Sequence, residues 1–352
     1  MPNDPVPVDP ASTEVREALA RWDLGELVSV ERLVGGSSAS PKFIARAQRG
    51  AFVLKRRAPR VSDAERIGFS HALIAASARA GVPVASPVRS RTGAAFEMAA
   101  GGSWELFPFI EGERWSRTDP QAAAGGDALG RMHRAGLDLL WHGHVVASSY
   151  HANLTVLEAL RLAPASVLRV EPDADAAELR SACESLGQAY REASAAVDEL
   201  GYASLDSQVV HGDFHPGNLL FTGDEVAGVI DFDAARIEPA VVDFANAIMQ
   251  FAAVRGRARK LARWPAALDQ GRFTAFARAY ARHGDPQLRT QVEMVAPLMI
   301  EACVAEASLP IARKGRFGTV RAEEMLHLVA RRTEWLRRQG AVVGDWLRSA
   351  LG

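Results

Sequence analysis

Three polar side chains between His211 and Asp233 have the types and the spacing needed for the transfer of a charged group. Asp213 and Asn218 lie five residues apart on a segment of Gly, His and Pro, and Asp231 follows a second apolar run. Magnesium takes oxygen ligands in proteins, few of them from side chains and the rest from water and phosphate. Asn218 and Asp231 can therefore hold magnesium, which leaves Asp213 to accept the proton of an attacking hydroxyl group.

Two apolar runs predict the element that positions these residues. The runs 219–221 and 226–230 flank the turn-forming residues 222–225, a pattern typical of a β-hairpin. Symmetric pairing about the middle of the turn would place Asn218 opposite Asp231 at the open end. The sequence thus predicts that two carboxylates and one amide converge on one spot.

The full pattern resembles a known family. The motif His-Gly-Asp-x-His-x-x-Asn at 211–218, followed by Ile-Asp-Phe-Asp at 230–233, is similar to the aminoglycoside phosphotransferase and choline kinase group, the small-molecule relatives of protein kinases. The spacing of Asp213 and Asn218 equals that of the protein-kinase catalytic loop. The chain departs from the kinase motif at Gly212, where kinases have Arg, and in having Asp-Phe-Asp where they have Asp-Phe-Gly.

The resemblance implies an α+β fold with the two lobes of a protein kinase. A small antiparallel-sheet lobe, with a Gly-rich hairpin and one helix, would occupy residues 1–107. A larger, mostly helical lobe, with the catalytic loop and the acceptor site, would occupy residues 108–352. The similarity covers residues 27–250, and we expect the last hundred residues to shape the acceptor pocket.

The same resemblance implies that the γ-phosphoryl group of ATP moves to a hydroxyl group of a small molecule, such as a sugar, a hydroxy amino acid or an amino alcohol. Asp213 would position and deprotonate that hydroxyl group, and His211 would brace the loop. His215 would either brace the loop too or reach the substrate. Asn218 and Asp231 would hold Mg²⁺ between the phosphates, so that catalysis consists of positioning and electrostatics.

Further nucleotide ligands are expected in the first lobe. We predict strands at 27–34, 42–47 and 51–56, and the loop after the first strand contains Gly35, Gly36 and Ser37. Glycine lets backbone N–H groups approach phosphate oxygens, although such a loop is also an ordinary turn.

The third strand carries the expected phosphate ligand. Alternation along the strand puts Val53 and Lys55 on one face. By resemblance Lys55 grips the α- and β-phosphates, whereas without the downstream motif it would read as a surface lysine.

The acidic partner of Lys55 stays open. Kinases place a Glu on the next helix, which we predict at 62–79, and Glu65 is the acid available there. Glu65 also completes a capping box with Ser62, which gives it a structural role. The family position for the acid lies nearer Ser70 and His71, where the chain has none.

The segment 107–112 resembles the hinge between the lobes. Backbone groups near Phe109 and Ile110 would hold the edge of adenine, and the alternative is a plain connector. We predict further strands at 94–98 and 104–107 before it. Helices are expected afterwards at the following ranges: 121–135, 176–200, from 241, 271–283, 288–308, 321–338 and 343–350.

Several other polar residues have structural readings. His133 reads as a core histidine with its hydrogen bonds satisfied, and Asp243 as a helix cap or, by resemblance, an anchor of the catalytic loop. The segment 139–170 is expected to be irregular and exposed. Its His142, His144 and His151 fit no metal-ligand spacing, so we predict no metal site there.

Composition bounds the possible partners and the compartment. The chain has 352 residues, a formal net charge of −1 and two cysteines far apart, Cys183 and Cys303. This balance argues against a nucleic-acid partner, and the cysteines indicate buried thiols rather than a disulfide scaffold. We find no signal pattern and expect no membrane-spanning run. The sequence predicts a cytoplasmic protein that binds ATP and a small hydroxyl compound, with no membrane partner.

Two rival functions remain at this point. His211, Asp213 and His215 could form the ligand set of a metal hydrolase, although Gly212 favours a turn over the strand that this set would need. A catalytically silent nucleotide-binding protein is the other rival, because the helix acid is missing.

A positive charge excess towards the end of the chain bears on the acceptor. From residue 251 onward there are 18 Lys and Arg against 9 Asp and Glu. A group of four lies between two predicted helices: Arg313, Lys314, Arg316 and Arg321. Since a positive field repels polycations, we predict a neutral, zwitterionic or anionic acceptor.

Overall fold

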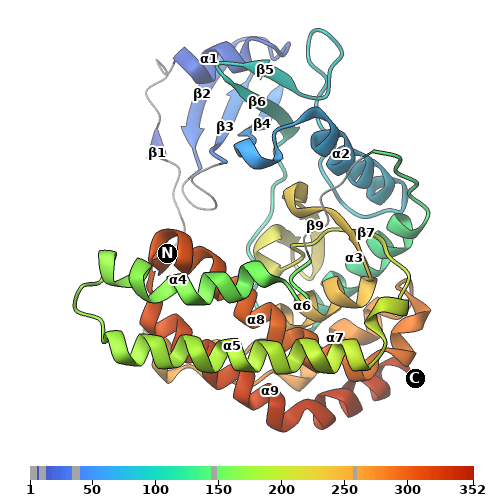
Figure 1. Cartoon of the computed structure of the whole chain (residues 1–352). Coiled ribbons are helices and arrows are strands. Elements are labelled where there is room, and N and C mark those ends of the chain that lie inside the picture. The colour runs from blue at the N-terminus through green and yellow to red at the C-terminus, as the bar shows by residue number, and fades with distance from the viewer. Residues whose placement is uncertain (1–5, 8–12, 34–39, 144–148, 257–259) are drawn as a thin grey trace.

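The computed structural model describes residues 6–7, 13–33, 40–143, 149–256 and 260–352. It has an antiparallel sheet in its N-terminal part and a larger helical part after it, joined by the chain that leaves β6 (Figure 1). The α+β protein-kinase-like fold predicted from the sequence is therefore confirmed.

The sheet has six strands in the order β1-β2-β3-β4-β6-β5, and all neighbours are antiparallel. The strands are β1 (Val6–Pro7), β2 (Leu27–Arg32), β3 (Lys42–Ala47), β4 (Gly50–Arg56), β5 (Glu97–Ala99) and β6 (Gly102–Pro108). The predicted strands at 42–47 and 51–56 match β3 and β4 closely, because both alternate apolar and polar residues between Gly and charged residues.

Two helices flank the sheet. Helix α1 (Thr13–Leu19) packs a separate small core with the sheet, which includes Trp22 and Trp104. Helix α2 (Ala64–Arg79) begins at Asp63, whose side chain accepts a hydrogen bond from the Arg66 N–H at 2.8 Å. The N-cap is thus Asp63 and not Ser62. The third helical residue is then Arg66, so the capping box expected from Ser62 and Glu65 is not formed.

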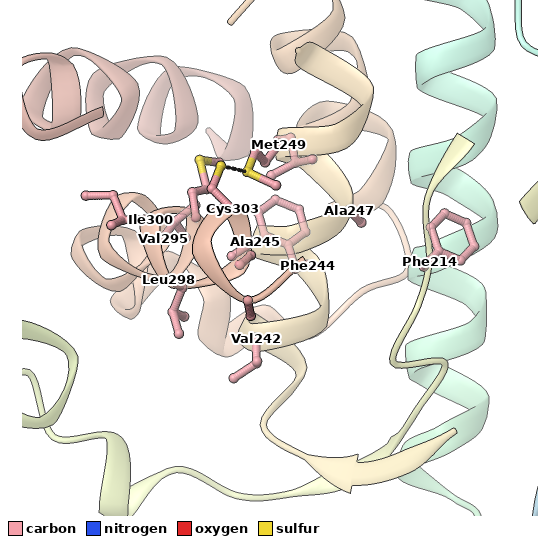
Figure 2. Packing of buried hydrophobic residues seen from close by; sticks show 14 of the residues in the cluster. Phe214, Val242, Phe244, Ala245, Ala247, Met249, Val295, Leu298, Ile300 and Cys303 are labelled. Atoms are coloured by element: carbon pink, nitrogen blue, oxygen red, sulfur yellow. Dashed lines mark hydrogen bonds between the residues drawn. The ribbon is translucent and has the colours of Figure 1, made fainter. Parts of the chain in front are cut away.

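The helical part contains seven α-helices among the described residues. They are α3 (Asp119–Leu137), α4 (Leu154–Val170), α5 (Ala176–Glu199), α6 (Ala240–Ala252), α7 (Gln270–Tyr280), α8 (Val292–Lys314) and α9 (Ala322–Leu351). Figure 2 shows the packing of α6 on α8, where Cys303 Sγ lies 2.9 Å from Met249 Sδ among aliphatic and aromatic side chains. Both cysteines are free and buried, as predicted.

Helix α8 passes through the middle of this core. In the part of the chain that the structure describes, it is the one helix long and apolar enough to cross a membrane, with a mean hydropathy of 1.5 in its best window. The expectation that no run reaches that length was therefore wrong. Since 78% of that window is buried within the protein, α8 is accounted for as a core helix.

Two other expectations about the helical part were wrong. Residues 154–170, expected to be irregular, form α4 despite Pro164, and Asn153 caps it by accepting from the Thr155 N–H. The chain from 322 to 351 is one helix and not two, and Gly340 lies within it without ending it.

Short ladders hold the segment that carries the motif. Strand β7 (Gln208–Val210) pairs with β10 (Arg236–Glu238), and β8 (Leu219–Thr222) pairs with β9 (Glu225–Val229) as the predicted hairpin. Residues 211–235 connect β7 to β10, and the pairing of these two strands fixes both ends of the segment that carries the motif.

Candidate active site

The 211–218 loop begins with a tight turn at Gly212. Its φ is +77°, and a Cβ at this position would lie 2.3 Å from the Ala234 carbonyl oxygen, so only glycine fits. The Gly212 N–H donates to Asp243 Oδ1 at 3.1 Å, and its carbonyl accepts from Arg236 Nη1 at 2.7 Å. Both backbone groups are thus held by buried charged side chains.

Asp243 ties this loop to the helical core. It is 1% exposed, and its Oδ2 contacts His133 Nε2 at 3.2 Å, while His133 Nδ1 contacts the Tyr280 hydroxyl at 2.9 Å. Helix α6 starts after Pro239 without a side-chain cap. The geometry therefore matches an anchor of the loop and not a cap, and His133 has both ring nitrogens satisfied.

His211 is completely buried and braces the loop from within. Its Nδ1 accepts from the Asp213 N–H at 3.2 Å, which leaves Nε2 to donate to the Ile230 carbonyl at 3.2 Å. Burial lowers the pKa of His211, so the ring is neutral. No lone pair of His211 is left for zinc, and the described residues contain no metal-ligating group of three His, Cys, Asp or Glu. The ligand set of the rival hydrolase is thus not formed.

Asp213, His215 and Asn218 meet on the outer side of the loop. Asn218 Nδ2 donates to Asp213 Oδ2 at 3.1 Å and to the Asp213 carbonyl at 2.9 Å. His215 Nε2 lies 3.6 Å from Asp213 Oδ1, and its Nδ1 accepts from the Gly217 N–H. Despite burial, which acts the other way, contact with Asp213 raises the pKa of His215. The Asp213 carboxylate is 45% exposed and so remains open to a substrate.

The hairpin register differs from the predicted one. Thr222 pairs with Glu225 across a two-residue turn, and Ala227 is an extra residue that bulges out of β9. Asn218 consequently faces Ile230, whose N–H donates to the Asn218 carbonyl at 2.9 Å. The expected pairing of Asn218 with Asp231 was wrong by one residue.

Asp231 leaves the ladder in a left-handed conformation. Its φ is +67°, which Asp tolerates better than most residues. Its Oδ1 lies 2.9 Å from Lys55 Nζ and its Oδ2 3.1 Å from Lys42 Nζ. Although burial acts the other way, the charges of Lys55 and then Lys42 hold the pKa of Asp231 well below its usual range.

Lys55 is 5% exposed and has two carboxylate partners, neither of them on helix α2. Its Nζ contacts Asp233 Oδ1 at 2.6 Å as well as Asp231. Burial opposes its charge, but these two carboxylates raise the pKa of Lys55. The Asp-Phe-Asp segment thus supplies the acidic partners of Lys55 that α2 does not, and Asp233 stands where kinases have glycine.

An ion-pair network that the sequence reasoning missed surrounds Lys55. Arg57 pairs with Asp233 at 2.7 Å and, in a bidentate contact, with Glu105 of β6, which also meets His71 Nε2 at 2.6 Å. Glu105 is 0% exposed, and although burial acts the other way, the hydrogen bond from His71 and the charge of Arg57 lower its pKa to about 2. An acid inside the apolar run Trp-Glu-Leu-Phe was the signal that could have revealed it.

A cavity of about 490 Å³ lies against these charges. Lys42, Lys55 and Asp231 line its polar side. Its apolar wall comes from strands of both parts, from α2 and from the connector after β6, and includes Val53, Ile74, Phe107, Phe109, Ile110, Leu219 and Val229. Val53 and Lys55 therefore share a face towards the cavity, as the alternation predicted.

The predicted hinge forms one wall of this cavity. Glu113 exchanges two hydrogen bonds with Phe221, and a Cβ on Gly112 would lie 2.9 Å from Leu220 Cβ, so this connector is tied to the hairpin. The Phe109 N–H donates to the Ala51 carbonyl, which removes it as a donor to a base. Ile110 remains beside the cavity.

Some predicted residues lie elsewhere. Gly35, Gly36 and Ser37 are outside the described residues, as is His144. His151 is buried and not exposed as expected, because its Nδ1 contacts Glu301 at 2.9 Å and its Nε2 contacts Asp198 at 3.2 Å.

Known structures share this fold. The chain aligns with the microcompartment-associated aminopropanol kinase at a TM-score of 0.64 and 15% identity, covering 94% of this chain and 98% of that one. It aligns with an amicoumacin kinase, solved with AMP-PNP and Ca²⁺, at a TM-score of 0.62 and 16% identity, covering 94% and 92%. At these identities the likeness concerns the fold alone.

Sequence comparison extends the likeness. The chain is 30% identical over 237 residues to a homoserine kinase of Rhodopseudomonas palustris. The alignment covers 64% of this chain and 64% of the length of that relative. A family model described as the phosphotransferase enzyme family (APH) matches residues 29–289, which include every described residue of the site. The fold, the 211–218 loop and this match agree, and the chain belongs to the phosphotransferase enzyme family.

Proposed function

We propose that this protein is an ATP-dependent phosphotransferase that moves the γ-phosphoryl group of ATP to a hydroxyl group of a small molecule. The observation that carries the proposal is that two contacting pairs, Lys55 with Asp231 and Asn218 with Asp213, are joined at the edge of one cavity. Lys55 and Asp231 line the cavity, as do Gly217 and Leu219 on either side of Asn218, and the Ile230 N–H next to Asp231 donates to the Asn218 carbonyl at 2.9 Å. Family membership supports the same reaction class.

The cavity suits ATP in size and polarity. Its volume lies within the roughly 300–1,000 Å³ usual for sites of this kind. The apolar wall would take the base, with backbone groups near Phe109 and Ile110, other than the Phe109 N–H, at its edge. Lys55 and Lys42 would contact phosphate oxygens. Lys42 was not expected, but its Nζ reaches the same carboxylate as Lys55. Gly35, Gly36 and Ser37 remain our proposed cover of the phosphates.

Asn218 and Asp231 fit Mg²⁺. Both oxygens of Asp231 face lysine ammonium groups, so this carboxylate already sits in a place that accepts positive charge. Asn218 uses its Nδ2 on Asp213, and among the described hydrogen bonds its Oδ1 accepts none. These are the oxygen donors that Mg²⁺ prefers. When bound, the ion would neutralise charge on the transferring phosphoryl group.

Asp213 would orient the acceptor hydroxyl and take its proton. Its Oδ2 is held by Asn218, and His215 lies near its Oδ1, so the carboxylate is fixed while nearly half of its surface stays open. His211 would hold the loop backbone through its two hydrogen bonds and take no part in proton transfer. Positioning of this kind accounts for most of the rate enhancement in phosphoryl transfer.

The acceptor and the compartment belong to the same proposal. Similarity to homoserine kinases makes a hydroxy amino acid one acceptor to test, beside sugars and amino alcohols. We place the reaction in the cytoplasm, where ATP is supplied. Two buried free thiols fit that reducing compartment.

The test is ADP release by the purified protein with ATP, either Mg²⁺ or Zn²⁺, and a panel of hydroxyl compounds. We expect release that needs Mg²⁺ and is stimulated by one class of acceptor, with a phosphomonoester product visible by phosphorus NMR. Release of phosphate with Zn²⁺ and no acceptor would instead favour the hydrolase. Tight ATP binding without turnover on any acceptor would favour a silent nucleotide-binding protein.

A further inference from the structure

A second cavity adjoins the first one and has a different character. Its volume is about 220 Å³, below the range usual for drug-sized ligands. Trp115, Arg117 and Arg255 line both cavities, so the second one, called here the acceptor pocket, continues from the first. The remaining lining comes from the end of α6 and the residues after it, from α8, α9 and the hairpin of β11 (Arg316–Phe317) and β12 (Val320–Arg321), and includes Gln250, Trp264, Glu306, Phe317, Leu328 and Arg332.

Glu306 provides a carboxylate that no cation contacts in the described part of the chain. Gln250 Nε2 donates to its Oε2, and Asn246 is its other hydrogen-bonding neighbour, so both partners are neutral amides. No ion pair reaches Glu306 among the described residues. The charged groups that face it are His215 and Asp213 from the 211–218 loop. A half-buried carboxylate of this kind is costly unless a positive group completes it.

The opposite charge on this pocket is also unpaired. In the described part of the chain, no carboxylate forms an ion pair with Arg117, Arg255 or Arg332. Arg117 and Arg255 instead lie over the rings of Trp115 and Trp264, at 5.7 and 5.0 Å. The Nε of Arg332 is buried without a hydrogen-bond partner.

The backbone at Arg117 is strained. Its φ is +64°, a conformation that costs a non-glycine residue about 1–3 kcal/mol. Burial and then the charge of Arg255 lower the pKa of Arg117, which shows that like charges lie close together here. Because Arg117 and Arg255 line the same cavities, the place where they meet favours a negatively charged group.

We propose that the acceptor pocket binds a small amino acid with a hydroxyl group on its side chain, holding the ammonium group on Glu306 and the carboxylate on Arg332. This rests on the proposed function and deepens it by naming the acceptor class. The hydroxyl end would point towards Asp213, which lies in electrostatic reach of Glu306. The apolar lining would cover the methylene groups, and Arg117 and Arg255 would draw the carboxylate into the mouth.

The size and the charges of the pocket also exclude other acceptors. A volume of about 220 Å³ is small for a multi-ring aminoglycoside, which would have to extend out of this pocket. An amino alcohol would satisfy Glu306 and leave the guanidinium groups unpaired, and a hydroxy acid would do the reverse. Only a zwitterion completes both charges, and rejecting an analogue that lacks one group is how polar sites gain specificity.

The arginines singled out from the sequence lie elsewhere. Arg321 pairs with Asp173 at 3.0 Å and also contacts Glu171 and Glu323. Its charge is used to fix the hairpin before α9 to the end of α4. The positive groups at the pocket are instead Arg117, Arg255 and Arg332. Arg255 and Arg332 belong to the basic segment that starts at residue 251 but are not among the four residues singled out there, and Arg117 precedes that segment.

Three probes separate the two charges. L-homoserine carries a hydroxyl, an ammonium and a carboxylate group, 3-amino-1-propanol lacks only the carboxylate, and 4-hydroxybutyrate lacks only the ammonium. We expect kcat/KM for homoserine to exceed that for each truncated probe by about 10–150-fold, the worth of one hydrogen bond to a charged group. Equal kcat/KM for homoserine and either truncated probe would overturn the proposal.

Two variants assign the charges to residues. Glu306→Gln should lower kcat/KM for homoserine by about 10–150-fold and leave 4-hydroxybutyrate unchanged, whereas Arg332→Gln should lower it for homoserine and leave 3-amino-1-propanol unchanged. Arg338→Gln, on the exposed face of α9, is the matched control and should change neither. Equal losses on all three probes would mean that the substitutions act on folding or on chemistry, which contradicts the assignment.

A binding measurement separates this inference from the proposed function. Calorimetry with homoserine in the presence of AMP-PNP and Mg²⁺ needs no turnover. If homoserine binds to the wild type but not to Glu306→Gln, while no probe is phosphorylated, the pocket assignment stands and the phosphotransferase proposal fails. If a sugar is phosphorylated and homoserine does not bind, the pocket assignment fails and the phosphotransferase proposal stands.

Discussion

Glu105 is buried and Glu306 is half-buried, they lie on opposite sides of the site, and their surroundings differ. Glu105 is paired with Arg57 and His71, and although burial acts the other way these partners lower its pKa to about 2. Glu306 has only amide partners, and burial raises its pKa to about 7 against the attraction of His215. One carboxylate is neutralised within the chain, and the other is not.

The difference separates framework from recognition. On the nucleotide side, lysines, arginines and carboxylates satisfy one another in a network that spans β4, β6 and the Asp-Phe-Asp segment. On the acceptor side, the carboxylate of Glu306 and the guanidinium groups of the three pocket arginines form no ion pair in the described part of the chain. Charges that a protein leaves unpaired in a cavity are those available to a ligand, because each regains its lost solvation only when the complementary charge arrives.

The largest expected effect comes from the residue between the two sides. Asp213→Asn should lower turnover by about 10²–10⁴, the usual worth of a positioned general base. The amide oxygen can still accept from Asn218, so MgATP affinity should stay near the wild-type value. Single-turnover kinetics and nucleotide titration measure the two quantities separately. Wild-type turnover in this variant, with the true acceptor, would remove Asp213 as the base.

Breaking the paired side should cost stability. Glu105→Gln leaves Arg57, which is 3% exposed, with Asp233 as its remaining carboxylate. We expect the free energy of unfolding to decrease by an amount near the lower end of the roughly 3–5 kcal/mol lost when a buried ion pair loses one partner. Urea denaturation measures this, with Glu306→Gln as the comparison. An equal loss in both variants would contradict the contrast between the two glutamates.

The metal assignment can be tested at Asp231. Mg²⁺ increases the affinity for ATP, and in Asp231→Asn this increase should be about 10–100-fold smaller than in the wild type. That is the range seen when groups that support a metal are removed. Because Lys42 and Lys55 lose a competing carboxylate, the affinity for ATP without Mg²⁺ should stay the same or increase. Titration with and without Mg²⁺ gives both numbers. If Mg²⁺ tightens ATP equally in the wild type and the variant, Asp231 does not hold it.

A further test is the pH dependence of stability at Glu306. Its folded pKa, about 7, lies above the ordinary value of 4.5, so the folded state binds the extra proton between these values. Stability should therefore decrease as pH rises from about 4.5 to 7 and then level off. Glu306→Gln should remove this slope, as should saturating homoserine. Parallel pH profiles for the wild type and the variant would show that Glu306 is not the group responsible.

Much of the site could be predicted because it is local in sequence. The spacing of Asp213, Asn218 and Asp231 reflects one loop and one hairpin, and the alternation around Lys55 gives its face. The exact register could not be predicted. The bulge at Ala227 depends on how β9 fits against Pro83 and Ile110, and a symmetric turn gives no hint of it.

The partners of Lys55 could not be predicted because they come from far away in sequence. In the register of the sheet, Lys55 lies opposite Lys42 on β3 and opposite Glu105 on β6, so these three charged residues form one row across the sheet. Strand order and register, and not any local pattern, bring them together. The same holds for Glu306, which lies on an apolar helix and carries no motif.

The turn at Gly212 has a consequence for how this loop could change over generations. Kinases have an arginine at that position, whereas here the guanidinium group of Arg236, from β10, reaches the Gly212 carbonyl, and it pairs with Glu238 at 2.6 Å. A Cβ on Gly212 would lie 2.4 Å from Arg236 Nη1. An arginine at 212 would thus collide with Arg236. Changing Arg236 as well would not be enough, because the Ala234 carbonyl oxygen would still lie 2.3 Å from the new Cβ and φ at this position is +77°. A chain with arginine at 212 would therefore need a different backbone path through this turn.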